Sequence, residues 1–266
     1  MTKHIISSRF PKKHSDFKDI HLAIDTFVIE KPTTSFLSRH SIIVTQGSCF
    51  ALEIYRSFEK NGFNIEYNEF TEAINSPIAN EYYFRQIENL PLDPMHIKIK
   101  EADIFILTLG VSALWFNKIT NEWQNKIDPA QIAEYHMRTI SVEEAKKSLA
   151  AIYQSLFNIN NNIKLVITLS PIPLNLSVEF NSIFIADCLS KSTLRCAIHE
   201  SLVTLKTTKP VLYFPAFEIV RWLGGYIGYV YGDNKDPSHD KPRAIQPDYV
   251  NEIVNAFIRN YLIKDA

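Results

Sequence analysis

The chain has 266 residues, of which 46% are hydrophobic and 12% aromatic, which is enough for one large α/β domain with a buried core. Its 28 Lys and Arg nearly balance its 29 Asp and Glu, so binding to nucleic acid or to an anionic membrane has little support. The three cysteines are an odd number without metal-ligand spacing, which favours a reducing compartment and gives no indication of a metal site.

The first 40 residues are expected to form an N-terminal extension packed on an α/β domain that spans residues 41–266. This extension carries mixed charge and the prolines Pro11 and Pro32, and it lacks the apolar stretch of a secretory signal. No run in the sequence approaches the roughly 18 apolar residues of a membrane span. The sequence therefore predicts a soluble, cytoplasmic protein.

Four apolar runs predict buried strands, and a shorter run predicts one more strand after the first helix. Because the four runs lack polar alternation, both faces of each strand are expected to be covered. The four runs are Ile42–Thr45, Ile104–Leu109, Leu165–Leu169 and Val211–Phe214, and the shorter run is Phe63–Tyr67.

Helical patterns lie between these strands. An apolar stripe predicts a helix over Phe50–Asn61, which Gly62 ends, and the spacing of Ser141 and Glu144 is that of a capping box at the start of a second helix. The alternation of strands and helices predicts a mostly parallel sheet with right-handed crossovers and helices on both faces. Ligands of such sheets bind beyond the carboxyl ends of the strands. Two further helices are predicted over Ser182–Leu205 and Asp248–Leu262.

The segment Gly47-Ser48-Cys49-Phe50-Ala51 stands where the first apolar run gives way to the first helix. Gly47 lets the backbone bend, and the first N–H groups of the helix, with its dipole, favour negative charge near Ser48. Ser48 is therefore either a nucleophile or simply the N-cap of the helix, since serine is among the preferred caps. Cys49 is a second candidate nucleophile, although a buried structural cysteine is the expected outcome.

Glycine also follows the second core strand, in Thr108-Leu109-Gly110-Val111-Ser112. The Gly110 N–H is a candidate oxyanion donor, and the alternative is a glycine that only permits a tight turn. The chain has only seven glycines, so one directly after each of two successive core strands is informative. The third strand ends in Ser170 and two nearby prolines, a rigid exit that shapes a rim. Ser112 and Ser170 are the candidate substrate-binding residues at these strand ends.

A late acid and histidine pair, Asp236 and His239, lies just ahead of the last predicted helix. In a loop, this spacing lets the carboxylate orient the imidazole, which then serves a serine nucleophile as general base. The alternative is chance proximity, because the chain contains eight histidines.

These motifs together resemble the GSCFA domain family, which takes its name from the pentapeptide at Gly47–Ala51. The resemblance runs in order from about Ser41 to the final helix, and the most specific parts are the pentapeptide and the tyrosine-phenylalanine-proline segment. The further matching segments are Thr108–Gly110, Leu169–Pro173, Ser190–Arg195 and Tyr213–Val220.

The family is similar to the SGNH hydrolases, which hydrolyse or transfer acyl groups, often on carbohydrates. The resemblance implies a flavodoxin-like three-layer α/β/α sandwich with a mostly parallel central sheet. It implies that Ser48 is the nucleophile, that the backbone N–H groups of Ser48 and Gly110 form the oxyanion hole, and that a histidine from a late Asp-x-x-His segment is the base. Asp236 and His239 fit that segment.

Two departures from the family pattern bear on activity. Relatives often carry threonine and glutamate after the conserved glycine, whereas this chain has Ser112 and Ala113, so a polar side chain expected near the site is missing. In many relatives the late histidine directly follows an arginine, and the corresponding pair here is Arg243 and Ala244. Either the histidine has become Ala244, or the loop has shifted and His239 serves instead, and the sequence leaves both alignments open.

Two hypotheses about function follow. The first is an SGNH-like serine acyl-ester hydrolase or acyltransferase acting on an acylated carbohydrate or similar metabolite. The second is a catalytically degenerate member that binds a glycan or a partner protein in the old cleft. Neither requires a metal or a resident cofactor; transfer would need an acyl donor such as acetyl-CoA, for which the sequence has no phosphate-binding glycine loop.

Overall fold

The structure is a computed structural model that describes residues 9–30, 35–205, 211–228, 230–232 and 242–263. Its contacts divide the chain into two compact units, and each is described by itself. The first, called the α/β unit, is Arg39–Phe214, and the second, called the terminal unit, combines Met1–Ser38 with Pro215–Ala266. The sequence grouped residues 41–266 together, whereas the contacts place the last 52 of them with the N-terminal segment.

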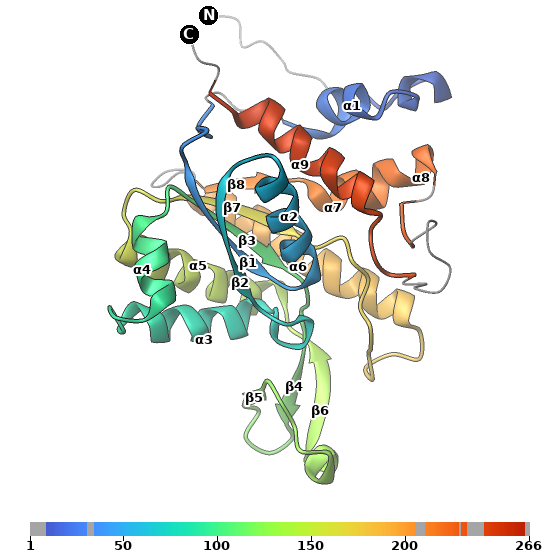
Figure 1. The fold of residues 1–266 in the computed structure, drawn as a ribbon. Coiled ribbons are helices and arrows are strands. Elements are labelled where there is room, and N and C mark those ends of the chain that lie inside the picture. Colours follow the sequence, from blue (N-terminus) through green and yellow to red (C-terminus); the bar gives the residue numbers. More distant parts are fainter. Residues whose placement is uncertain (1–8, 31–34, 206–210, 229, 233–241, 264–266) are drawn as a thin grey trace, which may run out of the picture. The chain divides into compact units, whose positions relative to one another are not determined.

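The central sheet of the α/β unit is parallel throughout. In the part of the chain that the structure describes, it has five strands in the order β2-β1-β3-β7-β8 (Figure 1). This is the strand order of flavodoxin-like folds, and it confirms the predicted fold class. The strands are β1 Ile42–Gly47, β2 Asn64–Glu69, β3 Ile104–Leu109, β7 Lys164–Leu169 and β8 Val211–Phe214, at the positions that the apolar runs predicted.

Helices cover both faces of this sheet. Helix α2 (Cys49–Lys60) carries the chain from β1 outward to β2, whereas α5 (Val142–Ile159) carries it from β3 in the opposite direction to β7. Because both crossovers are right-handed, the two helices lie on opposite faces. Helices α3 (Pro77–Glu88), α4 (Pro94–Glu101) and α6 (Ile183–Leu205) pack beside α5. The α/β unit is therefore a three-layer sandwich.

The helix ends follow the capping signals in the sequence. Helix α5 begins with the predicted capping box, in which Ser141 Oγ accepts from the Glu144 N–H at 3.1 Å and Glu144 Oε2 accepts from the Ser141 N–H at 2.7 Å. Arg138 donates to both oxygens of Glu144 and lowers the pKa of that carboxyl to about 2. Gly62 ends α2 with a φ of +78°, as the sequence predicted.

A second, smaller sheet stands at the carboxyl end of β3. Its strands are β4 (Ala113–Asn117), β5 (Trp123–Gln124) and β6 (Tyr135–Thr139), antiparallel in the order β5-β4-β6 (Figure 1). The sequence did not predict this sheet. The short helices η3 (Glu72–Ile74) and η4 (Pro129–Glu134) complete the loops at this edge.

The terminal unit is helical in its described part. The ring centroids of Phe36 and Phe257 lie 6.2 Å apart and Leu37 forms a bridge with Leu262, so its two sequence segments contact each other. None of the described helices in the chain is long and apolar enough to cross a bilayer. The helical elements are η1 His14–Phe17, α1 Ile20–Ala23, η2 Ile24–Val28, α7 Ala216–Glu218, η5 Ile219–Leu223, α8 Gly224–Ile227 and α9 Pro247–Tyr261.

Candidate active site

The strand order places Ser48 and Gly110 at the same edge of the sheet. After β1 the chain turns to one side, toward β2, and after β3 it turns to the other side, toward β7. The carboxyl ends of two neighbouring strands whose connections diverge form the crevice in which such folds bind ligands. Ser48 directly follows β1 and Gly110 directly follows β3, so the residues predicted from sequence lie at this crevice.

Gly47 lets the end of β1 approach the end of β3 closely. Its φ is +151°, and a Cβ built on it would lie 2.8 Å from Thr108 O and 2.9 Å from Thr108 Cβ. The Gly47 carbonyl accepts from the Phe70 N–H at 2.9 Å and from the Tyr67 hydroxyl at 3.1 Å. Burial raises the pKa of Tyr67 to about 12, so this phenol stays protonated and donates at neutral pH. The turn that presents Ser48 is thereby fixed.

Ser48 occupies the N-cap position of α2 without capping the helix through its side chain. The serines at the N-caps of α3 and α5, Ser76 and Ser141, both accept a hydrogen bond from the third residue of their helix. Ser48 is only 7% exposed, and its hydroxyl makes no such bond. The Ser48 side chain therefore does not cap the helix, which is the structural role that the sequence offered as the alternative to a nucleophile.

Cys49 is exposed on the first turn of α2, so the expectation that it is buried was wrong. Cys49 lies on the outer face of α2 because the next two residues, Phe50 and Ala51, occupy the buried positions of the first turn.

The Gly110 N–H is engaged within the protein. It donates to the carbonyl of Asn75 at 3.0 Å, which also accepts from the Val111 N–H at 3.1 Å. The Asn75 side chain in turn donates through Nδ2 to Thr108 O at 2.9 Å. The amide that the sequence assigned to an oxyanion hole thus already has an acceptor in this structure.

A chain of buried amides, which sequence reasoning missed, surrounds this turn. Gln46 Nε2 donates to Asn80 Oδ1 at 2.7 Å, and Gln46 Oε1 accepts from Asn68 Nδ2 at 2.7 Å. Asn80 Nδ2 donates to Ser76 O at 2.8 Å and lies 3.3 Å from Asn75 Oδ1. Gln46, Asn75 and Asn80 are fully buried. The signal available in the sequence was Gln46, a polar residue at the end of an apolar strand.

Helix α6 holds the exit of β3 from the other side. Ser112 N–H donates to Ser190 Oγ at 2.9 Å, and Ser112 Oγ donates to the Ser190 carbonyl at 3.1 Å. Lys191 is 2% exposed, and its Nζ donates to the Gly110 carbonyl at 2.6 Å. Ser112 is fully buried and hydrogen-bonded to α6, and its role in binding substrate stays a prediction.

Ser170, the other serine expected to bind substrate, ties β7 to β3. It is 2% exposed, and its N–H donates to the Leu109 carbonyl at 2.8 Å. Both serines therefore help to build the sheet edge.

Replacing Lys191 with methionine is expected to destabilise the protein by about 1–3 kcal/mol, because the buried Gly110 carbonyl loses its charged donor while the volume is nearly kept. The measurement is the urea midpoint of unfolding. Lys98 is the matched control, since the side chains of its ion pair with Glu66 are 39% and 48% exposed and Lys98→Met should cost at most about 0.5 kcal/mol. Equal effects of the two substitutions would show that the buried contact contributes nothing special.

The α/β unit itself supplies no evident base for Ser48. Its histidines are His40, His96, His136 and His199. His40 precedes β1 and His96 lies on α4 before β3, which places both at the opposite edge of the sheet, and His136 and His199 are exposed on β6 and α6.

Asp236 and His239 lie outside the described residues. Ala244 is described, and its carbonyl accepts from the Gly232 N–H at 2.9 Å. The two alignments of the late histidine therefore both stand as predictions.

Among solved structures, the chain is similar to three enzymes at low identity. It matches a salicylyl-acyltransferase from a tetracycline biosynthetic pathway with 10% identity and a TM-score of 0.44, covering 87% of this chain and 56% of that one. It matches a carbohydrate esterase family 2 enzyme from Corynascus thermopiles with 11% identity and a TM-score of 0.45, covering 87% and 66% of the two chains. It matches a carbohydrate esterase family 3 enzyme from Talaromyces cellulolyticus with 9% identity and a TM-score of 0.42, covering 81% and 92%.

The aligned part spans only about half of the acyltransferase and about two thirds of the family 2 esterase. Because all three TM-scores are below 0.5, the fold class rests on the strand order of this chain itself. A comparison with curated proteins finds no match.

The family comparison gives a match over most of the chain. The model of the GSCFA family matches residues 80–249 of the 266, a span that begins after the pentapeptide and includes the exits of β3 and β7 and the Ser190–Lys191 contacts. The matched residues lie outside the pentapeptide and point to the same family as the pentapeptide does. The chain therefore belongs to the GSCFA family.

Proposed function

We propose that this protein is an SGNH-like serine acyl-ester hydrolase or acyltransferase that acts on an acylated carbohydrate or a similar metabolite. The observation that carries the proposal is the Ser48 hydroxyl, which lies at the N-terminus of α2 beside the crevice of the sheet and does not cap the helix. A serine oxygen placed next to unpaired helix N–H groups is poised where an acyl carbonyl would develop negative charge.

In the proposed reaction, Ser48 Oγ attacks the acyl carbon and passes its proton to the imidazole of His239, which Asp236 orients. The bond between the acyl carbon and the alcohol oxygen then breaks, and the leaving alcohol takes the proton. Water completes hydrolysis, and a second hydroxyl completes transfer to a new acceptor. The Ser48 N–H is the first oxyanion donor, and the Gly110 N–H joins it by exchanging the Asn75 carbonyl for the oxyanion.

The alternative function is a binding module that keeps the crevice without the chemistry. It is favoured by Ala244, if that residue replaces the family histidine. Acetyl-CoA is the expected donor only if the protein transfers acetyl groups. The cytoplasmic location of the protein is also a prediction.

A fluorophosphonate probe tests the proposal directly. An activated serine oxygen displaces fluoride from phosphorus and retains the phosphonyl group, whereas ordinary surface serines react far more slowly. We expect one adduct per chain, located on Ser48 by peptide mass spectrometry, and no adduct on protein unfolded in urea. A folded protein that takes up no label at Ser48, or one labelled equally on its surface serines, would support the binding module instead.

A further inference from the structure

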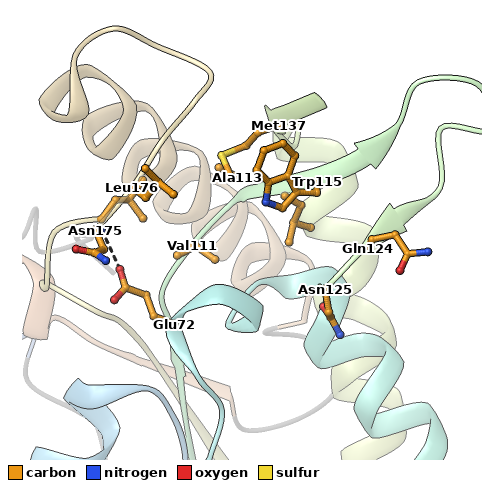
Figure 2. A pocket seen from close by; sticks show the side chains of 11 residues that line it. Glu72, Val111, Ala113, Trp115, Gln124, Asn125, Met137, Asn175 and Leu176 are labelled. Atoms are coloured by element: carbon orange, nitrogen blue, oxygen red, sulfur yellow. Dashed lines mark hydrogen bonds between the residues drawn. The ribbon is translucent and has the colours of Figure 1, made fainter. Parts of the chain in front are cut away.

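A pocket of about 310 Å³ opens at the same edge of the sheet as Ser48. It lies wholly within the α/β unit, and its lining comes from the loops that follow β2, β3 and β7 and from the small sheet (Figure 2). Those loops all leave the carboxyl ends of the parallel strands, which is where ligands of this fold bind. The lining contains Glu72, Val111, Trp115, Met137, Asn175 and Leu176, among others.

One wall of the pocket is formed by one face of the small sheet. Trp115 of β4 pairs directly with Gln124 of β5 and with Met137 of β6, so these three side chains share one face. Ala113 lies two residues before Trp115 on the same strand and lines the pocket too. An indole ring beside a thioether provides the kind of flat surface on which the C–H face of a ring can rest.

Polar groups surround this wall. The amides of Gln124, Asn125 and Asn175 line the pocket and are exposed to solvent, and each amide offers both donors and an acceptor. Glu72 contributes a carboxylate whose Oε1 accepts from the Asn175 N–H at 3.0 Å, which fixes the position of that acid (Figure 2). Hydroxyl groups, which donate and accept at once, suit such a rim.

The charge of the lining limits the class of ligand. No lysine or arginine is among the residues that line this pocket, and the one ionisable group is the Glu72 carboxylate. Among the lining residues, a phosphate or carboxylate ligand would meet the Glu72 carboxylate and no lysine or arginine. A plain acyl chain would cover the polar rim without replacing its hydrogen bonds to water, which costs free energy. A neutral ring that carries several hydroxyls avoids both costs, because it brings no negative charge and its hydroxyls replace the hydrogen bonds that the rim makes to water.

We infer that this pocket is a subsite for a neutral, pyranose-sized sugar ring, which stacks on Trp115 and Met137 and hydrogen-bonds to the rim amides. This inference rests on the proposed function, because the sugar would be the part of the substrate that carries the ester. Ala113 leaves the room for the ring, since a larger side chain at that position would project from the same face as Trp115.

Binding of free sugars to the intact protein tests the subsite apart from any catalysis. The probes are the methyl glycosides of glucose, galactose, xylose and N-acetylglucosamine, followed by saturation-transfer NMR and titration. We expect at least one to bind, with affinity about tenfold weaker in Trp115→Ala and in Ala113→Leu, the second variant filling the pocket without removing the wall. Trp222→Ala is the matched control, because that tryptophan is 70% exposed and lies in the terminal unit, and it should bind normally.

The outcomes separate the two proposals. Ser48→Ala should retain sugar binding, so a protein that binds glycosides but has no reactive serine contradicts the proposed chemistry and keeps the subsite. Absence of binding by all four glycosides, binding unaffected in both folded pocket variants, or displacement of the bound sugar by hexanoate at the same site would overturn the sugar assignment. Circular dichroism and thermal melting establish that each variant is folded.

Discussion

Replacing Ser48 with alanine is expected to reduce hydrolysis of p-nitrophenyl acetate at least about 1,000-fold, while the free energy of unfolding changes by less than about 0.5 kcal/mol. The activity falls because the substitution removes the attacking oxygen, and only the binding and oxyanion contributions remain. Stability is kept because the Ser48 hydroxyl makes no capping hydrogen bond that alanine would lose. The measurements are initial rates and urea unfolding of the same preparations.

Ser141→Ala is the matched control, since Ser141 is also an N-cap serine that follows a loop into a long helix. Its Oγ does accept from the Glu144 N–H, so alanine should cost about 0.5–2 kcal/mol in stability and leave turnover unchanged. The opposite pattern, in which Ser48→Ala destabilises the protein like a lost cap and turnover persists, would identify Ser48 as a structural residue.

The central sheet was predictable because burial on both faces imposes one simple pattern. Strand β3, which is buried along its whole length, carries uninterrupted apolar residues and was predicted at its observed bounds. The helix limits followed from local chemistry, the Ser141 capping box and the Gly62 cap, which depends on only a few neighbouring residues. The small sheet was missed because β5 has only two residues and β4 and β6 five each, too few to give a periodic signal.

The sequence predicted only those residues of the candidate site that directly follow the strands of the central sheet. Ser48 and Gly110 follow from the rule that ligands bind at the carboxyl edge of a parallel sheet. The partners of Gly110 do not, because the carbonyl of Asn75 and the ammonium of Lys191 are 35 and 81 positions away in sequence. Whether a buried polar residue contacts the Gly110 peptide depends on which elements become neighbours in the fold, and local sequence does not encode that.

These contacts give the crevice a rigid frame. The Gly110 peptide is held through its N–H by Asn75 and through its carbonyl by Lys191, and the neighbouring amides of Gln46 and Asn80 are hydrogen-bonded to each other. Fully satisfied buried polar groups favour one arrangement over others, since each alternative leaves a donor or acceptor unpaired. The serine and the pocket thus lie on a frame that is formed before binding, and in the proposed reaction only the Gly110 N–H exchanges its acceptor.

The rigidity of this frame begins at Gly47, and Gly47→Ala is expected to destabilise the protein by about 2–5 kcal/mol. The added methyl group would lie 2.8 Å from the Thr108 carbonyl oxygen, a backbone atom of the central strand β3, which cannot move without shifting the sheet. Because the same shift would displace Ser48 from the edge of the crevice, turnover should fall further than the loss of folded protein explains.

Gly62→Ala separates steric overlap from backbone conformation. Gly62 also has a positive φ, +78°, but nothing lies within 4 Å of a Cβ placed there, so alanine should cost only the conformational penalty of about 1 kcal/mol and leave turnover unchanged. Urea unfolding of both variants measures the difference. Equal losses of stability at the two glycines would mean that β1 and β3 can separate at this edge, and the close approach of Gly47 to Thr108 would then not be what holds Ser48 in place.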